Sequence, residues 1–403
     1  MSVGENSGGG LAKRDGTLLI PLATLLIVLD RRPSVQPLVW LLALLMSSRF
    51  VLDRGRAGRV YLGVPLLAFV AIAAASLVWS DDPRYSAPAV ISLGAFVIII
   101  MYMASFITSE NAARLMTHGC FAAALLTVVD VLARPAVASG PSGFRGVFTH
   151  KNWLALAMGL LVLGALLTPL QRTLLGKIEA AVGIALLLLA HSVGSFIAIA
   201  IALAFAGSKR WVMPSLSPIV RRALGRASVV CALVLLYLNR GRLGDFVSQI
   251  GKTKSVDRRL QLWQLVLRFG ARRPVVGWGF RGTWSNTGGV TARIEAALGG
   301  FQAFAAHNGY LDVFLQLGVV GLLCVAGIVV IAFRRARWSA ASDASYWMAA
   351  VVFIAVFTMS DSFIAGHAGW FVLALAYTYQ INGPAGHVGG VAGLLRNTGR
   401  VRA

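Results

Sequence analysis

Long apolar runs alternate with short polar and basic segments along the whole chain. A helix needs about 20 consecutive apolar residues to cross the hydrocarbon core of a bilayer, and fewer if it is short or kinked. By this measure we count about twelve candidate spans. They are residues 17–29, 35–46, 60–79, 86–107, 112–132, 152–168, 174–190, 192–206, 228–238, 308–333, 345–364 and 366–381. The first two runs are short, so they are either two full spans, which we favour, or a hairpin that inserts less deeply.

This pattern predicts an all-α polytopic integral membrane protein. The composition agrees, since 57% of the 403 residues are hydrophobic and 13% are charged, more apolar surface than one soluble core could cover. The runs divide the chain into four parts. They are an N-terminal bundle with about nine spans (1–238), a large loop (239–306), a C-terminal bundle with about three spans (307–381) and a basic tail (382–403).

The distribution of Lys and Arg predicts the orientation. With the N-terminus inside, the short outer loops hold few cations, namely Arg31, Arg32, Arg84, Arg134, Arg145 and Lys151, whereas the inner side holds many more. The positive-inside rule therefore places both termini in the cytoplasm and the loop 239–306 outside. The same rule accounts for the net charge of +22, so we expect no nucleic-acid partner.

The large outer loop contains an amphipathic segment. Leu260, Trp263, Val266 and Leu267 recur at helical spacing, which predicts a helix lying on the membrane surface. The loop is also rich in arginine, and a positive field on this face requires an anionic partner. That partner is either the phosphates of membrane lipids or a phosphorylated, lipid-linked substrate.

His307 lies where the loop meets the next apolar run. The positive end of a helix starting near Asn308 disfavours an added proton, so a neutral imidazole could act as a general base. Asn308, Asp312 and Gln316 follow at intervals of four residues and form a polar stripe that we expect to face the bundle interior. The alternative is a histidine that only caps a helix at the interface.

A second polar cluster precedes the run 152–168. Arg145 and Lys151 flank a glycine-containing turn and Asn152 begins the run, an arrangement that could hold a diphosphate at membrane depth. Lipid headgroups are the simpler partner. Arg258 and Arg259, at the start of the amphipathic segment, are open to the same two interpretations.

Other chemistry is poorly supplied. Asp361, near the outer end of its run, is polar enough to line a cavity. The histidines show no close pairing, so we predict neither a metal site nor a cofactor. Cys120, Cys231 and Cys324 are far apart within apolar runs and have neither disulfide nor metal spacing.

Three blocks in this order resemble the superfamily of O-antigen polymerases and O-antigen ligases. They are Arg-Gly-Val-Phe-Thr-His-Lys-Asn at 145–152, Arg-Leu-Gln-Leu-Trp at 259–263 with Pro-Val-Val-Gly-Trp-Gly at 274–279, and His-Asn-Gly-Tyr at 307–310 with Leu-Gly-Val-Val-Gly at 317–321. The first block looks most like the exopolysaccharide-polymerase branch. The likeness covers most of the chain, although each block alone is weakly specific.

The resemblance implies an inverting, metal-independent glycosyltransferase of the GT-C-like type in the bacterial inner membrane. Such enzymes move a glycan from undecaprenyl diphosphate to another chain on the periplasmic face. Membrane lipids and a chain-length regulator are further implied partners. By the same resemblance His307 would be the catalytic base, and Arg145 and Arg259 would bind the diphosphate. The doubled Arg258-Arg259 departs from the family pattern, in which one arginine is usual, so the second assignment could shift by one residue.

Three functions therefore remain open. The first is a polymerase of lipid-linked oligosaccharide repeats, which we favour. The second is a ligase that transfers the glycan to lipid A core or to a protein. The third is a lipid-linked oligosaccharide flippase, which should show internal symmetry and polar groups along a midplane path. The sequence shows no repeat, and its polar residues gather at the outer edge.

Overall fold

The computed structural model describes residues 9–29, 34–52, 60–134, 139–140, 143–211, 253–285, 288–300, 302–339 and 343–382, and these residues are mostly helical. The N-terminal half contributes α1 (Gly9–Val28), α2 (Gln36–Leu52), α3 (Val64–Ala75) continued by the 3-10 turn Ser76–Val78, α4 (Pro83–Phe106), α5 (Ser109–Ala133), α7 (Lys151–Leu167), the 3-10 turn Pro169–Arg172, α8 (Leu174–Ala190) and α9 (Val193–Trp211). The C-terminal half contributes α12 (Thr253–Gly270), the 3-10 turn Gly282–Trp284, α13 (Gly289–Ala297), α14 (Gly309–Trp338), α15 (Ala344–Phe357) and α16 (Ala368–Asn382).

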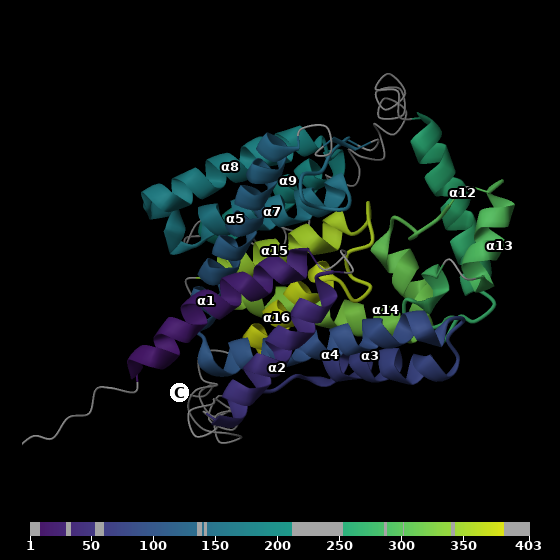
Figure 1. The fold of residues 1–403 in the computed structure, drawn as a ribbon, viewed down its shortest axis with the longest axis horizontal. Helices are drawn as coiled ribbons and strands as arrows, with labels where there is room; N and C mark the ends of the chain where they lie inside the picture. Colours follow the sequence, from purple (N-terminus) through teal and green to yellow (C-terminus); the bar gives the residue numbers. More distant parts are fainter. Residues whose placement is uncertain are drawn as a thin grey trace, which may run out of the picture.

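Three helices form the centre of the bundle. Nearly every residue of α7, α15 and α16 is buried, as expected for helices that are apolar all round. The helix α15 packs against α9 and α7, while α16 packs against α14 and α4. In Figure 1, α15 and α16 lie between a layer made of α5, α7, α8 and α9 and a layer made of α3, α4 and α14.

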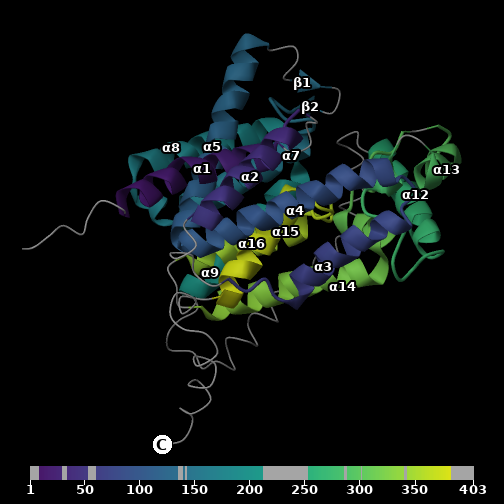
Figure 2. The same cartoon turned by 60° about the horizontal axis from the view of Figure 1, so that its bottom comes forward.

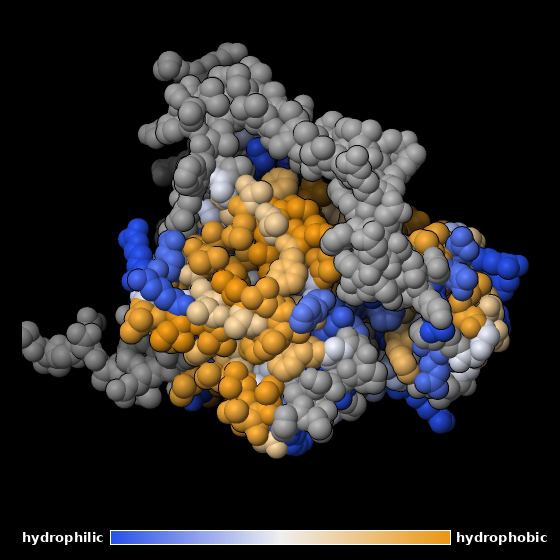
Figure 3. Space-filling view, turned by 90° about the horizontal axis from the view of Figure 1, so that it is seen from above, coloured by the Kyte–Doolittle hydropathy of each residue, from blue (hydrophilic) through white to orange (hydrophobic). Residues whose placement is uncertain are grey.

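The outside of the bundle is apolar as well. On α8, large hydrophobic side chains such as Leu174, Ile178 and Leu188 are exposed, and Figure 3 shows a broad apolar face on the side where α8 and α9 lie in Figure 1. Of the described helices, α4, α5 and α14 are long and apolar enough to cross a membrane, and several shorter helices are apolar. The chain is therefore a helical membrane protein. The number of about twelve spans stays a prediction, and the run 228–238 lies outside the described residues.

The described part of the large loop is folded as a small helical unit. Leu262, Val266 and Phe269 of α12 are buried together with Trp284 and Ile294 in a separate apolar core. The predicted amphipathic helix is confirmed. The prediction that its apolar face lies on the membrane holds for only part of that face. Val266 and its inward neighbours pack on protein, whereas Leu260 and Leu267 are each 48% exposed. The helical periodicity was correct, but periodicity alone could not distinguish a protein core from a membrane surface.

The same unit lies at one end of the bundle, beside the start of α14, as Figures 1 and 2 show. A short antiparallel pair, Ser139–Gly140 with Gly143–Phe144 (β1 and β2), lies near the start of α7. We call this end of the bundle the site end, because the candidate residues gather there.

The helix α14 is interrupted at Gly318, whereas the sequence predicted one continuous run. Gly318 has φ 64° and ψ −158°, a backbone conformation that L side chains rarely adopt. The segment Pro274–Gly279 fills the break. The amides of Trp278 and Gly279 donate to the carbonyls of Leu315 and Gln316, and the amides of Val319 and Val320 donate to the carbonyls of Pro274 and Val275. The groups freed at the two new helix ends are thus paired with protein backbone.

The helix α15 ends earlier than predicted. The run 345–364 was expected to be one span with Asp361 near its end, but α15 stops at Phe357 and Asp361 lies in the connection to α16. This connection is itself apolar and buried, with Phe363 and Ile364 fully covered by protein. An apolar run therefore overestimates helix length where a loop is buried inside the bundle.

Candidate active site

Asp361 is the centre of a polar cluster at the site end. Its side chain is 5% exposed. The carboxylate accepts hydrogen bonds from Asn152 Nδ2 at 2.9 Å and from the amide of Ser362 at 2.8 Å. His307 Nδ1 lies 3.4 Å from Oδ1, and His150 Nδ1 lies 3.8 Å from Oδ2. A buried carboxylate with these neighbours can orient both imidazoles.

The surroundings keep Asp361 ionised. Burial alone would raise the pKa of this carboxyl, but the neighbouring imidazoles of His307 and His150 and the hydrogen bond from Asn152 outweigh it. The pKa of Asp361 is consequently held well below its usual range. The carboxylate of Asp361 is therefore a fixed negative charge within the site.

His307 lies just before α14, as predicted, although the helix begins at Gly309 and Asn308 is its N-cap. The Asn308 Oδ1 accepts from the amides of Tyr310 and Leu311, which is the usual role of asparagine at this position. His307 itself has φ 52°, an uncommon backbone conformation for a residue other than glycine. Such conformations persist where neighbouring contacts hold them, and they gather at functional sites.

Two contacts hold the segment that carries His307. Trp263 of α12 donates from Nε1 to the Ala306 carbonyl at 2.8 Å, and the Ala306 amide donates to Asp312 Oδ1 at 2.9 Å. Asp312 is therefore a supporting residue in the literal sense, since it fixes the backbone next to His307. Asp312 and Gln316 are both buried, as the polar stripe predicted.

His150 was quoted in the first sequence block but was not among the predicted site residues. Its ring centroid lies 6.4 Å from that of His307, and both side chains are about one-third exposed, at 31% and 33%. The signal in the sequence was its place beside Lys151 and Asn152. What the sequence could not show is that this block meets Asp361, which lies 209 residues after Asn152.

Asn152 joins three segments of the chain. It donates to Asp361 and accepts at Oδ1 from the Ser192 hydroxyl at 3.0 Å, so the starts of α7 and α9 are tied to the connection between α15 and α16. The side chain is 5% exposed. A buried amide whose nitrogen and oxygen both have hydrogen-bond partners positions its neighbours and is not itself a ligand-binding group.

The predicted diphosphate-binding cations come to the same end. Arg259 donates from Nη1 to the carbonyl of Ser360, next to Asp361, at 3.2 Å. Arg145 donates from Nη1 to the carbonyl of Thr149, next to His150, at 3.4 Å. Lys151 is the first residue of α7, and Arg258 is more exposed than Arg259. Lys151 and Arg259 are thus close enough to influence the His150 ring, and Arg145 binds the backbone directly before it.

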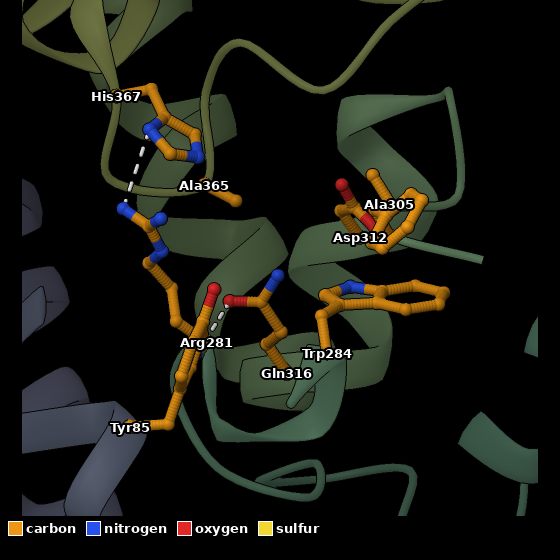
Figure 4. A pocket seen from close by; sticks show the side chains of 9 residues that line it. Tyr85, Arg281, Trp284, Ala305, Asp312, Gln316, Ala365 and His367 are labelled. Carbon is orange, nitrogen blue, oxygen red and sulfur yellow. Dashed lines mark hydrogen bonds between the residues drawn. The ribbon is translucent and has the colours of Figure 1, made fainter. Parts of the chain in front are cut away.

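A small polar pocket is lined by Ala305, two residues before His307, and by Arg281, Gln316 and His367, as Figure 4 shows. Arg281 donates from its amide to Gln316 Oε1 at 2.8 Å, and its Nη1 lies 3.3 Å from His367 Nδ1. Asp312 and Trp284 also line this pocket. Its volume of about 20 Å³ is enough for roughly one water, so it can hold a single hydroxyl but no sugar ring.

The arrangement is suited to transferring a group between oxygen atoms. A carboxylate and two imidazoles can accept and donate protons, and cations nearby can stabilise negative charge on a departing anion. Among the described residues there is no group of three or more His, Cys, Asp or Glu side chains placed to hold a metal ion.

Comparison with known proteins agrees with this chemistry. Residues 178–326 match the O-antigen ligase family, a stretch that includes Arg259 and His307. The chain is also similar to the exopolysaccharide production protein ExoQ of Rhizobium meliloti (strain 1021). The two are 23% identical over 354 residues, which cover 83% of this chain and 80% of that protein. Both matches support a membrane polymerase or ligase of exopolysaccharide or O-antigen biosynthesis. They agree with the resemblance carried by the three sequence blocks and support a place for the chain in the superfamily of the O-antigen ligases and ExoQ.

Proposed function

We propose that the protein is an inverting, metal-independent glycosyltransferase that polymerises oligosaccharide repeats linked to undecaprenyl diphosphate. The observation that supports this most is the meeting of His307, Asp361 and Arg259 at one end of an apolar bundle. A base and a cation at the edge of the hydrocarbon suit a substrate with a polar head and a lipid tail.

In this proposal His307 removes the proton of an acceptor hydroxyl. Asp361 orients the imidazole through Nδ1, so that Nε2 faces the acceptor. The acceptor oxygen forms a bond to the anomeric carbon while the bond from that carbon to the diphosphate oxygen breaks. Arg145 and Arg259 stabilise the negative charge that develops on the diphosphate.

The proposal includes a location. The site end faces the periplasm, both termini lie in the cytoplasm and the bundle lies in the bacterial inner membrane, because the positive-inside rule orients the short loops in this way. A chain-length regulator remains a candidate partner.

A ligase is the second candidate function. The description of the matched family as O-antigen ligase favours it, whereas the likeness to an exopolysaccharide production protein favours polymerisation. A flippase is less well supported, because the candidate residues lie at one end of the bundle rather than along a path through its middle.

The deciding experiment uses the purified protein in lipid vesicles with one lipid-linked repeat unit. A polymerase converts it into a ladder of longer products, and excess chelator leaves the ladder unchanged. A single addition to lipid A core would identify a ligase instead. If the lipid-linked repeat is not consumed with any acceptor, the glycosyltransferase assignment is wrong.

We expect Arg259→Ala to weaken use of the lipid diphosphate by about 10- to 100-fold, because a charge-assisted contact to the leaving group is lost. Arg258→Ala is the matched control, since Arg258 is the more exposed of the two and Arg259 is the one whose Nη1 donates to the Ser360 carbonyl beside Asp361. Transfer rates at several concentrations of lipid-linked repeat measure both variants. A silent Arg259→Ala with an inactive Arg258→Ala would shift the assignment by one residue.

A further inference from the structure

The hydrogen bond at the start of α7 determines where the proton of His150 lies. His150 is the N-cap of α7, and its Nδ1 accepts the amide proton of Asn152 at 3.2 Å. A ring nitrogen that accepts a hydrogen bond carries no proton of its own. In the neutral ring the proton must therefore lie on Nε2, which makes no hydrogen bond within the described part of the chain.

The surroundings favour this neutral form. Burial lowers the pKa of His150, and the nearby cations Lys151 and Arg259 lower it further, although Asp361 acts in the opposite direction. His150 also lies 3.8 Å from Asp361 Oδ2, too far for a hydrogen bond. The ring is consequently a neutral donor that presents Nε2–H.

His307 is arranged the other way. Its Nδ1 faces the Asp361 carboxylate at 3.4 Å, which favours a proton on Nδ1 and leaves Nε2 as an acceptor. The two rings are 6.4 Å apart and similarly exposed. The site therefore offers one accepting and one donating imidazole to the same substrate.

The cations show which part of the substrate meets the donor. Arg145 is bound to the carbonyl of Thr149, directly before His150, and Lys151 follows it. Arg259 is close enough to influence the His150 ring electrostatically. An anionic diphosphate held by these cations would therefore lie within reach of His150, which leaves His307 for the acceptor.

We propose that His150 is a further catalytic residue, whose Nε2–H donates a hydrogen bond to the diphosphate oxygen that leaves the anomeric carbon. This role of His150 rests on the proposed function, and it names a residue that acts on the leaving group of the proposed transfer. The electron pair of the breaking carbon–oxygen bond stays with the diphosphate, the acceptor proton goes to His307, and His150 keeps its proton throughout. The hydrogen bond strengthens as charge develops on that oxygen, so it lowers the barrier more than it tightens binding.

Two substitutions separate this role from helix capping. His150→Asn keeps an acceptor near the position of Nδ1 and remains a good N-cap, but it has no group at the position of Nε2. His150→Gln places an amide N–H near the position of Nε2 and gives up the short cap. Capping alone predicts an intact Asn variant and an impaired Gln variant, and the proposal predicts the reverse.

Both variants are compared with wild type in vesicles that contain the lipid-linked repeat. We expect His150→Asn to lower the maximal rate by about 100-fold with little change in KM, and His150→Gln to retain roughly 10-fold more activity than the Asn variant. Equal losses, or an Asn variant as active as the Gln variant, would overturn the role of His150. A wild-type protein that does not consume the repeat would instead overturn the proposed function.

Discussion

Replacing His307 with alanine is expected to lower glycan transfer by about 10²- to 10⁴-fold, the usual contribution of a general base. The imidazole is the group that Asp361 orients, and no other described side chain at the site end faces this carboxylate with an ion-pair distance as short as 3.4 Å. The variant should still insert, because the segment is held by Trp263 and Asp312 through backbone atoms of Ala306. Polymer formed in membranes, normalised to the amount of inserted protein, measures the effect.

His191→Ala is a matched control for this substitution. His191 has φ 48°, close to the 52° of His307, so alanine meets a similar backbone strain at both positions. Its Nδ1 bonds only locally, to the carbonyl of Leu189. We expect near-normal transfer from His191→Ala. Polymer of wild-type length and yield from His307→Ala would remove His307 from the mechanism.

The second large effect is expected from Asp361→Asn. An amide has nearly the same shape as the carboxylate, but its NH2 group must face either Asn152 Nδ2 or His307 Nδ1. In the wild type Asn152 Nδ2 donates to the carboxylate and His307 Nδ1 lies against it. We expect a loss of transfer of at least about 10-fold. The clash of donors in a buried place should also lower the free energy of unfolding by about 1 to 3 kcal/mol.

Two measurements test the role of Asp361. Thermal unfolding in detergent reports the loss of stability, and the rate of repeat consumption reports the loss of transfer. If Asp361 acts through His307, adding Asp361→Asn to His307→Ala should cause little further loss of transfer. A full second loss in the double variant would show that Asp361 acts on the substrate independently.

Local patterns predicted much of the fold and part of the site. A helix was expected to start near Asn308, and α14 begins directly after it. The polar stripe of Asp312 and Gln316 is buried as expected. These predictions succeeded because each depends on residues within a few positions of one another.

The remaining features depend on contacts between distant segments. Asp361 meets Asn152 and both histidines only because the connection after α15 folds back against the starts of α7 and α14. The apolar residues that follow Asp361 made this connection resemble the end of a membrane span. The break at Gly318 gave no local signal either, since glycine is common in membrane helices and the loop that fills the break lies about 40 residues earlier in the sequence.

The loop that fills the break in α14 brings two glycines into mutual contact, and this contact bears on the evolution of the chain. A Cβ at Gly318 would lie 2.2 Å from the Val275 oxygen, and a Cβ at Gly277 would lie 2.4 Å from the Gln316 carbonyl carbon. Each glycine therefore makes room for the backbone of the other segment. Related chains should keep or lose the two together, because a lineage that changed one alone would have to rebuild the junction beneath His307.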